Sequence, residues 1–256
     1  MWLGLAGLTG VKSICRSVRT ATCIPGMFPG RKVRESCHQA NTPGGGRENH
    51  QVCESCLRAS GEGGGRTTIG FVRRDLPYRQ ITDVSEYRFD DILRDDRVTD
   101  IGANVGAFCI RAAQFSDHVL AVEPVTWETL EENIMLNRVP VKTVRGALGD
   151  GSVGEVSWDG VRVSVLTYTL GQIIRMAGGC DFLKCDCEGA EWLIRPKELE
   201  GIRRIEMELH IPPIGGPPNP ALLEYIGSNY DFWIERMPCH DVMGVMGILH
   251  AKSLDR

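Results

Sequence analysis

The sequence contains no apolar run that approaches the roughly twenty residues needed to span a bilayer, so we expect no membrane span. It has no excess of basic residues: the formal net charge is −4, which argues against a protein that binds nucleic acid over a broad surface. The N-terminus lacks both a basic region ahead of its apolar stretch and a clear small-residue cleavage site, so we expect no secretory signal. We find no internal repeat. These absences favour a cytoplasmic globular protein.

The ten cysteines are many for a chain of 256 residues. Three of them, Cys109, Cys185 and Cys187, fall inside expected core elements, where a thiol acts as a small hydrophobe. In a chain of this size the even number does not imply disulfides, so we expect a reducing compartment.

Residues 1–66 differ in composition from the rest of the chain. They contain two Gly-Gly-Gly runs, few large aliphatic residues and a basic balance, which favours a flexible arm over a packed domain. A zinc site in this arm stays open as an alternative. Its candidate ligands are Cys37, His38, His50, Cys53 and Cys56. We therefore divide the chain into an arm at 1–66 and a folded domain at 67–256.

The folded domain alternates between short apolar strands and amphipathic helices. Strands are expected at 98–101, 119–122, 141–148, 181–185 and 202–209, and helices at 107–115, 126–137, 170–176 and 220–230. We also expect a short helix within 81–93, a hairpin at 153–169, and a closing antiparallel pair at 232–237 and 245–251. Strands that alternate with helices predict an α/β fold with a doubly wound, mostly parallel sheet and helices on both faces.

The stretch Val98–Phe108 joins the first strand to the first helix through the pattern Asp-x-Gly-x-x-x-Gly. Gly102 and Gly106 allow the backbone to approach a ligand closely, because glycine has no Cβ. The second strand ends at Glu123, where a carboxylate can accept hydrogen bonds from both ribose hydroxyls of a nucleoside. The stretch therefore predicts a nucleoside-binding site.

Asp100 separates this pattern from Gly-x-Gly-x-x-Gly, the fingerprint of dinucleotide-binding folds. In those folds a pyrophosphate lies at the N-terminus of the helix, and we expect a carboxylate at Asp100 to repel it. The same charge would suit a cationic ligand such as S-adenosylmethionine. An NAD(P)-dependent oxidoreductase is therefore the less favoured enzyme class.

Polar residues follow five successive expected strands. In an open α/β sheet, ligands bind beyond the carboxyl ends of the strands, so these side chains should surround one site. In chain order they are Asp100 and Asn104, Glu123, Asp150, Asp186 and Glu188, and Glu208 and His210.

Two motifs resemble those of the FkbM-type methyltransferases. The stretch from Val98 to Asn137 is similar to that family's cofactor-binding half. Asp181–Glu191 is similar to its second hallmark, D-x-L-K-[IV]-D-[IV]-E-G-[AS]-E, with Cys185 and Cys187 where aliphatic residues are usual. The resemblance covers roughly residues 80 to 256. It implies a Rossmann-like class I methyltransferase fold and S-adenosylmethionine-dependent O-methylation of a hydroxyl on a sugar, lipid or secondary metabolite.

The resemblance also implies roles for individual residues. Glu123 would hold the ribose hydroxyls of the cofactor, and Asp150 would reach the adenine amino group. Asp186 and Glu188 would face the methyl group that is transferred. The residues implied around the methionine end and the ribose are Asp100, Gly102, Asn104 and Gly106.

An alcohol is a poor nucleophile near neutral pH, so a base should assist the transfer. His210 is the first candidate, followed by Glu188 and Asp186. A divalent cation held by these three residues is the less favoured alternative, and we predict no metal. An alternative from another class is a zinc-stabilised binding module with a vestigial methyltransferase fold. We expect a small-molecule, glycan or lipid acceptor and no nucleic-acid partner.

Overall fold

A computed structural model describes residues 69–72, 82–237, 240 and 244–255. The arm predicted at 1–66, with its candidate zinc ligands, lies outside the described residues. None of the helices in the described ranges has both the length and the apolar character that crossing a bilayer requires.

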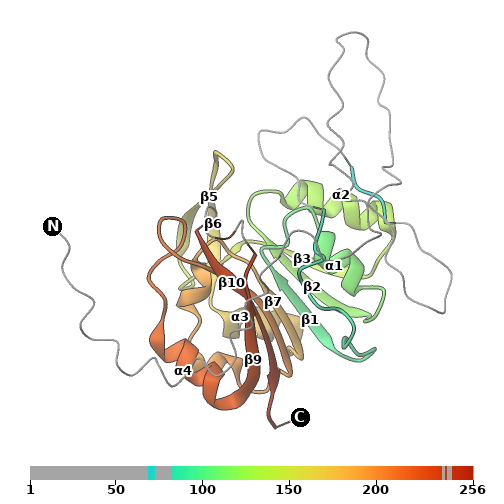
Figure 1. Cartoon of the computed structure of the whole chain (residues 1–256). Helices are drawn as coiled ribbons and strands as arrows, with labels where there is room; N and C mark the ends of the chain where they lie inside the picture. The colour runs from blue at the N-terminus through green and yellow to red at the C-terminus, as the bar shows by residue number, and fades with distance from the viewer. Residues whose placement is uncertain (1–68, 73–81, 238–239, 241–243, 256) are drawn as a thin grey trace, which may run out of the picture.

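A seven-stranded sheet in the order β3-β2-β1-β7-β8-β10-β9 forms the centre of the described domain (Figure 1). Its strands are β1 (Arg97–Ile101), β2 (His118–Glu123), β3 (Val141–Arg145), β7 (Phe182–Cys185), β8 (Arg204–His210), β9 (Tyr230–Glu235) and β10 (Val245–Ser253). β10 runs antiparallel to both of its neighbours, and the other neighbouring strands are parallel. The chain builds outward from β1 on one side and then on the other, so the predicted doubly wound, Rossmann-like α/β sheet is confirmed. The closing antiparallel pair is confirmed as β9 and β10.

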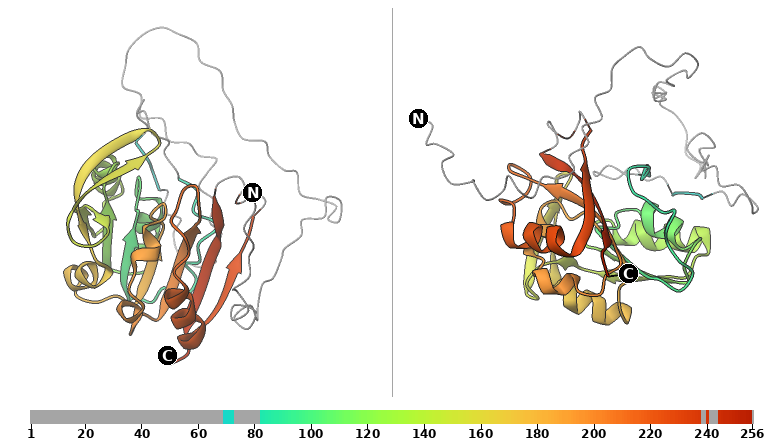
Figure 2. Two further views of the ribbon diagram at one scale, coloured as in Figure 1. Left: turned by 90° about the vertical axis from the view of Figure 1, so that its left-hand side faces the viewer. Right: turned by 60° about the horizontal axis from the view of Figure 1, so that its bottom comes forward.

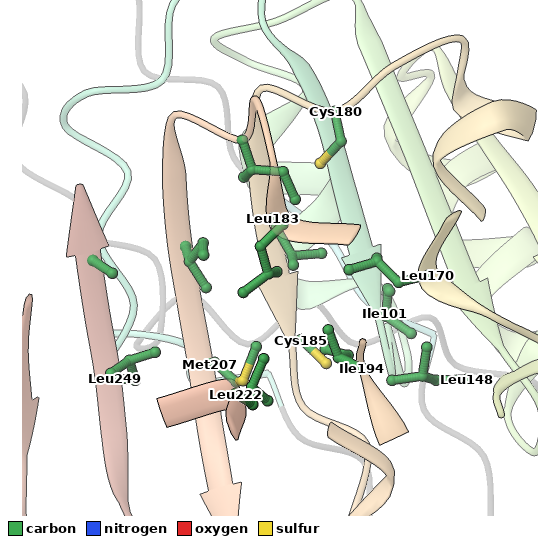
Figure 3. Close-up of a cluster of buried hydrophobic side chains, with 14 of the residues drawn as sticks. Ile101, Leu148, Leu170, Cys180, Leu183, Cys185, Ile194, Met207, Leu222 and Leu249 are labelled. Atoms are coloured by element: carbon green, nitrogen blue, oxygen red, sulfur yellow. The ribbon is translucent and has the colours of Figure 1, made fainter. Parts of the chain in front are cut away.

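Helices cover both faces of this sheet (Figure 2). The elements are α1 (Ala107–Ala112), α2 (Trp127–Asn137), α3 (Leu170–Ala177) and α4 (Pro220–Asn229), with the 3₁₀ turns η3 (Ala190–Leu193) and η4 (Pro196–Leu199). Phe108 of α1 and Leu130 of α2 belong to one cluster of buried apolar side chains. Leu170 of α3 and Leu222 of α4 belong to the second cluster, which Figure 3 shows packed against the central strands. The buried thiol of Cys185 lies in this second cluster, as its apolar character predicts.

The strand predicted at 141–148 is divided at Gly146. β3 pairs with β2 of the large sheet, whereas the following residues belong to a small sheet in the order β4-β6-β5. Its strands are β4 (Ala147–Leu148), β5 (Val153–Trp158) and β6 (Val161–Tyr168), and β5 and β6 form the predicted hairpin. A Cβ on Gly146 would lie 2.7 Å from the Tyr168 ring and 2.8 Å from the Leu166 carbonyl oxygen. The chain therefore leaves the large sheet at a position that only glycine fits.

The helix predicted within 81–93 is wrong. Residues 82–96, here named the entry segment, contain three separate tight turns. Each turn is closed by one bond from an N–H to the carbonyl oxygen three residues earlier, and the donors are Tyr87, Ile92 and Asp96. The aromatic rings that suggested a helix pack across α1 instead: the centroids of Tyr87 and Phe89 lie 5.8 and 4.7 Å from that of Phe108. The spacing of these aromatic residues therefore reflects their packing on Phe108 and not a helix.

The entry segment is fixed to strands that come much later in the chain. The Arg88 guanidinium pairs with Glu235 of β9 at 3.0 Å, and the Arg88 backbone N–H donates to Glu206 of β8 at 3.0 Å. Asp96 accepts a hydrogen bond from the Arg203 guanidinium at 2.6 Å. These contacts fix the segment to the sheet, from the amino ends of β1 and β8 at Asp96 and Arg203 to the carboxyl end of β9 at Glu235.

Candidate functional site

A cavity of about 580 Å³ lies at the carboxyl ends of β1, β2, β7 and β8. This is the edge at which open α/β sheets bind ligands. The entry segment forms one wall, with Tyr87 and Glu86, and the small sheet contributes Trp158. Residues near the C-terminus, including His240, complete the lining. The site is therefore assembled from four separate parts of the chain.

The glycine turn after β1 is tied to the end of β2. The N–H groups of Gly102 and Ala103 both donate to the Val122 carbonyl oxygen, at 3.0 and 3.1 Å. The Asn104 N–H donates to Oε2 of Glu123 at 2.8 Å. Gly102 has a φ of 75°, and Asn104 adopts a positive φ of 49°. Gly102, Asn104 and Glu123 all line the cavity, so the predicted turn and the predicted acid do lie together.

Gly102 tolerates no side chain, because a Cβ would lie 1.7 Å from the Asp186 carbonyl oxygen. We expect Gly102→Ala to lower the free energy of unfolding by at least about 2 kcal/mol, from the left-handed backbone and the clash together. Gly178→Ala is the matched control, since Gly178 has a φ of 77° and nothing within 4 Å of its Cβ position. Urea unfolding measures both variants. Equal losses in the two would show that the clash with Asp186 carries no cost.

Glu123 is buried, and its two oxygens have different surroundings. Oε1 accepts from the N–H groups of Val125 and Thr126, at 2.7 and 2.9 Å. Oε2 accepts the Asn104 N–H, and a carboxylate oxygen with one such bond can accept a second. Burial raises the pKa of Glu123, and the backbone N–H bonds oppose that rise. The carboxylate is thus held rigidly at the cavity wall by backbone donors.

Asp100 does not line the cavity, so its predicted role as a ligand-facing charge is corrected. It lies inside β1 and is fully buried, and its carboxylate is 3.2 Å from the ammonium of Lys184 on the neighbouring strand β7. Lys184 also donates to the Gly102 carbonyl oxygen at 2.8 Å and lies 3.7 Å from Asp186. Burial raises the pKa of Asp100, against the opposing charge of Lys184. Asp100 therefore supports the turn from beneath.

Two other predicted cofactor residues also lie away from the cavity lining. Asp150 is exposed and accepts from the Ser152 N–H and hydroxyl, at 2.9 and 2.6 Å. Its displacement follows from the break at Gly146, which carries the chain into the small sheet before Asp150 is reached. Gly106 is the N-cap of α1 with a φ of 93°, and a Cβ there would lie 2.8 Å from Leu130. Gly106 thus serves the packing of α1 on α2.

The opposite end of the cavity is acidic and surrounds one imidazole nitrogen. Nε2 of His210 lies 3.5 Å from Glu188, 3.7 Å from Glu208 and 3.9 Å from Asp186, measured to the nearest carboxylate oxygen. Asp186 also accepts from the Tyr87 hydroxyl at 3.1 Å. The structure therefore brings together the three residues predicted to be catalytic, and we name this group with Glu208 the acidic end.

Charge coupling is strong at the acidic end. Burial lowers the pKa of His210, but the hydrogen bond and charge of Glu191 and the charges of Asp186 and Glu208 outweigh it and raise the pKa to about 9. Burial and the charge of Asp186 raise the pKa of Glu208 to about 9. Burial acts in the same direction on Asp186, but Lys184 and His210 overcome it and lower its pKa. Their surroundings thus make both His210 and Glu208 bind a proton more tightly than the isolated side chains do.

Sequence reasoning missed Glu191, which orients His210. Glu191 is fully buried, and its Oε1 lies 2.5 Å from the His210 backbone nitrogen and 3.2 Å from Nδ1 of the ring. Its Oε2 accepts the Gly189 N–H at 2.9 Å. The available signal was its position: Glu191 is the last residue of the Asp181–Glu191 motif, whose other acids, Asp186 and Glu188, were assigned to the site.

Two aromatic residues of the site were also missed. Tyr87 bonds to Asp186, and the Trp158 indole N–H donates to Glu188 at 3.1 Å. They come from the entry segment and from β5, so no local pattern connects them to β7. Cys187, expected in the core, is half-buried; it packs against the second cluster and also lines the cavity.

No family model and no curated protein matches the sequence. Among solved structures, the chain is similar to a protein of the NADB-Rossmann superfamily from Streptococcus agalactiae, with 11% identity, coverage of 64% of each chain and a TM-score of 0.39. It is similar to the methyltransferase FkbM from Methylobacillus flagellatus, with 13% identity over 63% of this chain and 45% of that one, and a TM-score of 0.40.

A third similar structure is a dimethyladenosine transferase from Plasmodium falciparum, with 8% identity over 65% of this chain and 59% of that one, and a TM-score of 0.43. The chain spans less than two thirds of the length of each of these three proteins. Similarity at this level concerns the fold, and the residues of the cavity carry the function proposed below.

Proposed function

We propose that this protein is an S-adenosylmethionine-dependent methyltransferase. The supporting observation is that one cavity has a carboxylate at each side. Glu123 lies where β2 ends, and the acidic end lies opposite, where β7 and β8 end. Glu123 offers an acceptor oxygen to ribose hydroxyls, and the carboxylates of the acidic end favour a ligand with positive charge. A nucleoside that carries a sulfonium and an ammonium group fits both requirements.

The nicotinamide alternative is less well supported by the same residues. A dinucleotide needs free N–H groups at the glycine turn to hold its pyrophosphate. Here the N–H groups of Gly102 and Ala103 donate to Val122 and that of Asn104 donates to Glu123. The carboxylates that line the cavity would also repel phosphate, which argues equally against a nucleic-acid strand as the partner.

For the acceptor we propose a hydroxyl on a sugar, lipid or secondary metabolite, as the FkbM-type resemblance implies. When bound, S-adenosylmethionine would supply a methyl group already activated on sulfur, so the chain mainly has to position the acceptor oxygen. Asp186, Glu188 and His210 are proposed to face that oxygen. Glu191 would hold the His210 ring in place through Nδ1.

Isothermal calorimetry of the whole chain against S-adenosylmethionine and against NAD tests the proposed cofactor. We expect heat of binding with S-adenosylmethionine and none with NAD. Binding of NAD alone, or no heat with S-adenosylmethionine at millimolar concentration, would reject the proposal.

Glu123→Gln tests the ribose contact. Glutamine removes the negative charge that would accept hydrogen bonds from the ribose hydroxyls. We therefore expect S-adenosylmethionine to bind about 10- to 100-fold more weakly, the loss typical of hydrogen bonds to a charged group. Glu128→Gln is the control, because Glu128 is exposed on α2 and lies outside the cavity lining. Unchanged affinity in Glu123→Gln would exclude Glu123 as the ribose acceptor.

A further inference from the structure

Three residues at the acidic end present ligand atoms to one point. Asp186 and Glu188 follow β7, and His210 ends the neighbouring strand β8. One oxygen of each carboxylate and a ring nitrogen of His210 all lie within 4.8 Å of one another. The backbone of Glu188 adopts a positive φ of 52°, and its side chain lies 3.5 Å from His210.

Nε2 of His210 makes no hydrogen bond to the described residues. Its distances of 3.5 to 3.9 Å to three carboxylates are longer than hydrogen bonds. The His210 side chain is nevertheless only 3% exposed, and it lines the cavity. Two ligands of one metal ion, each at about 2.0–2.2 Å, lie roughly 3–3.6 Å apart. The 3.5 Å from Nε2 to Glu188 falls in this range, whereas the 3.9 Å from Nε2 to Asp186 would have to shorten when an ion binds.

The surroundings of the other ring nitrogen match those of a metal-binding histidine. A histidine that binds a metal almost always donates its second ring N–H to a carboxylate, a carbonyl or water, which fixes the ring and its tautomer. Nδ1 of His210 lies 3.2 Å from Oε1 of Glu191, which is fully buried and also accepts the His210 backbone N–H. The imidazole is therefore held with Nε2 facing the two carboxylates.

We propose that Asp186, Glu188 and His210 bind a divalent first-row metal ion. One imidazole and two carboxylates suit Mn²⁺, Fe²⁺ or Zn²⁺ better than Mg²⁺ or Ca²⁺, which prefer oxygen ligands alone. Three protein ligands leave open positions, so the ion can polarise a further oxygen atom. The identification of this oxygen with the acceptor hydroxyl rests on the proposed function. The binding of the ion does not depend on that function.

The test is a titration of the whole chain with Mn²⁺, followed by the loss of the free-ion electron paramagnetic resonance signal, without S-adenosylmethionine. We expect one ion per chain. Glu188→Gln and His210→Asn should each weaken binding by about tenfold or more, and Glu191→Gln by about 10-fold, the lower end for an outer-shell partner. Glu155→Gln, an exposed carboxylate on β5 outside the cavity lining, should bind Mn²⁺ as the wild type does.

Two further controls keep the result interpretable. Cys53→Ser with Cys56→Ser removes two of the candidate thiol ligands in residues 1–66 and should leave Mn²⁺ binding unchanged. Thermal unfolding with EDTA and with Mn²⁺ reports folding: the wild type should gain stability with the ion, and folded Glu188→Gln should gain little. Since Glu188 is 45% exposed, its replacement should not prevent folding.

The outcomes separate this site from the proposed function. No stoichiometric Mn²⁺ binding, or equal binding by Glu188→Gln and the wild type, overturns the metal site. If S-adenosylmethionine still binds in that case, the proposed function stands. Bound Mn²⁺ without any affinity for S-adenosylmethionine supports the site and rejects the function.

Discussion

Lys184→Met should lower the free energy of unfolding by roughly 3–5 kcal/mol, the cost of removing one partner of a buried ion pair. Lys184 is 4% exposed and Asp100 is fully buried, and the two are 3.2 Å apart. Methionine preserves most of the side-chain volume but leaves the Asp100 carboxylate without its opposite charge. The Gly102 carbonyl oxygen also loses its donor. Urea unfolding, monitored by tryptophan fluorescence, measures the loss.

The double variant Asp100→Asn, Lys184→Met identifies the cause. Removing both charges should recover a large part of the lost stability, because no uncompensated ion then remains buried. Lys142→Met, an exposed lysine on β3, should change stability by less than about 0.5 kcal/mol. The single variant Asp100→Asn completes the comparison. If the double variant loses as much unfolding free energy as the two single variants do together, Asp100 and Lys184 do not act as an ion pair.

His210→Ala should retain S-adenosylmethionine binding and lose methyl transfer by about 10²- to 10⁴-fold, the range for removal of a group that assists proton transfer. His210 lies at the acidic end, whereas the proposed nucleoside contacts come from Glu123 and the turn after β1. The loss is expected whether the imidazole takes the proton itself or holds a cation that activates the hydroxyl. Calorimetry measures binding, and tritium from methyl-labelled S-adenosylmethionine measures transfer to a panel of hydroxyl acceptors.

His118→Ala is the matched control, because His118 is an exposed histidine at the opposite end of β2. It should leave both binding and transfer unchanged. Normal transfer by His210→Ala would remove His210 from the reaction, and loss of cofactor binding in the same variant would place it in the cofactor site.

The sheet could be predicted because its signals are local. β1 and β2 are short apolar runs, each followed by a helix, and right-handed crossovers then leave few possible strand orders. The two errors have tertiary causes. The run Val141–Leu148 reads as one strand, but packing against Tyr168 at Gly146 divides it between two sheets. The aromatic residues of the entry segment read as a helix because their partner, Phe108, is not visible in a local window.

The site was predictable to the extent that strand ends define it. Asp186, Glu188 and His210 meet because parallel strands end at a common edge. Asp100 was misassigned because alternation along β1 points its side chain at Lys184, and one strand cannot reveal its neighbour. Trp158 lies 30 residues from its partner Glu188, and Tyr87 lies 99 residues from Asp186. Contacts of this range leave no trace in local sequence patterns.

The fixation of the entry segment has a consequence for synthesis of the protein on the ribosome. Arg88 can form its ion pair only after Glu235 has been synthesised, 147 residues later. Asp96 can bond to Arg203 only after a further 107 residues have been added. Val245, one of the residues that line the cavity, belongs to the last strand. A nascent chain can therefore pair β1, β2 and β3 early, but its ligand cavity closes only after the final strand has emerged.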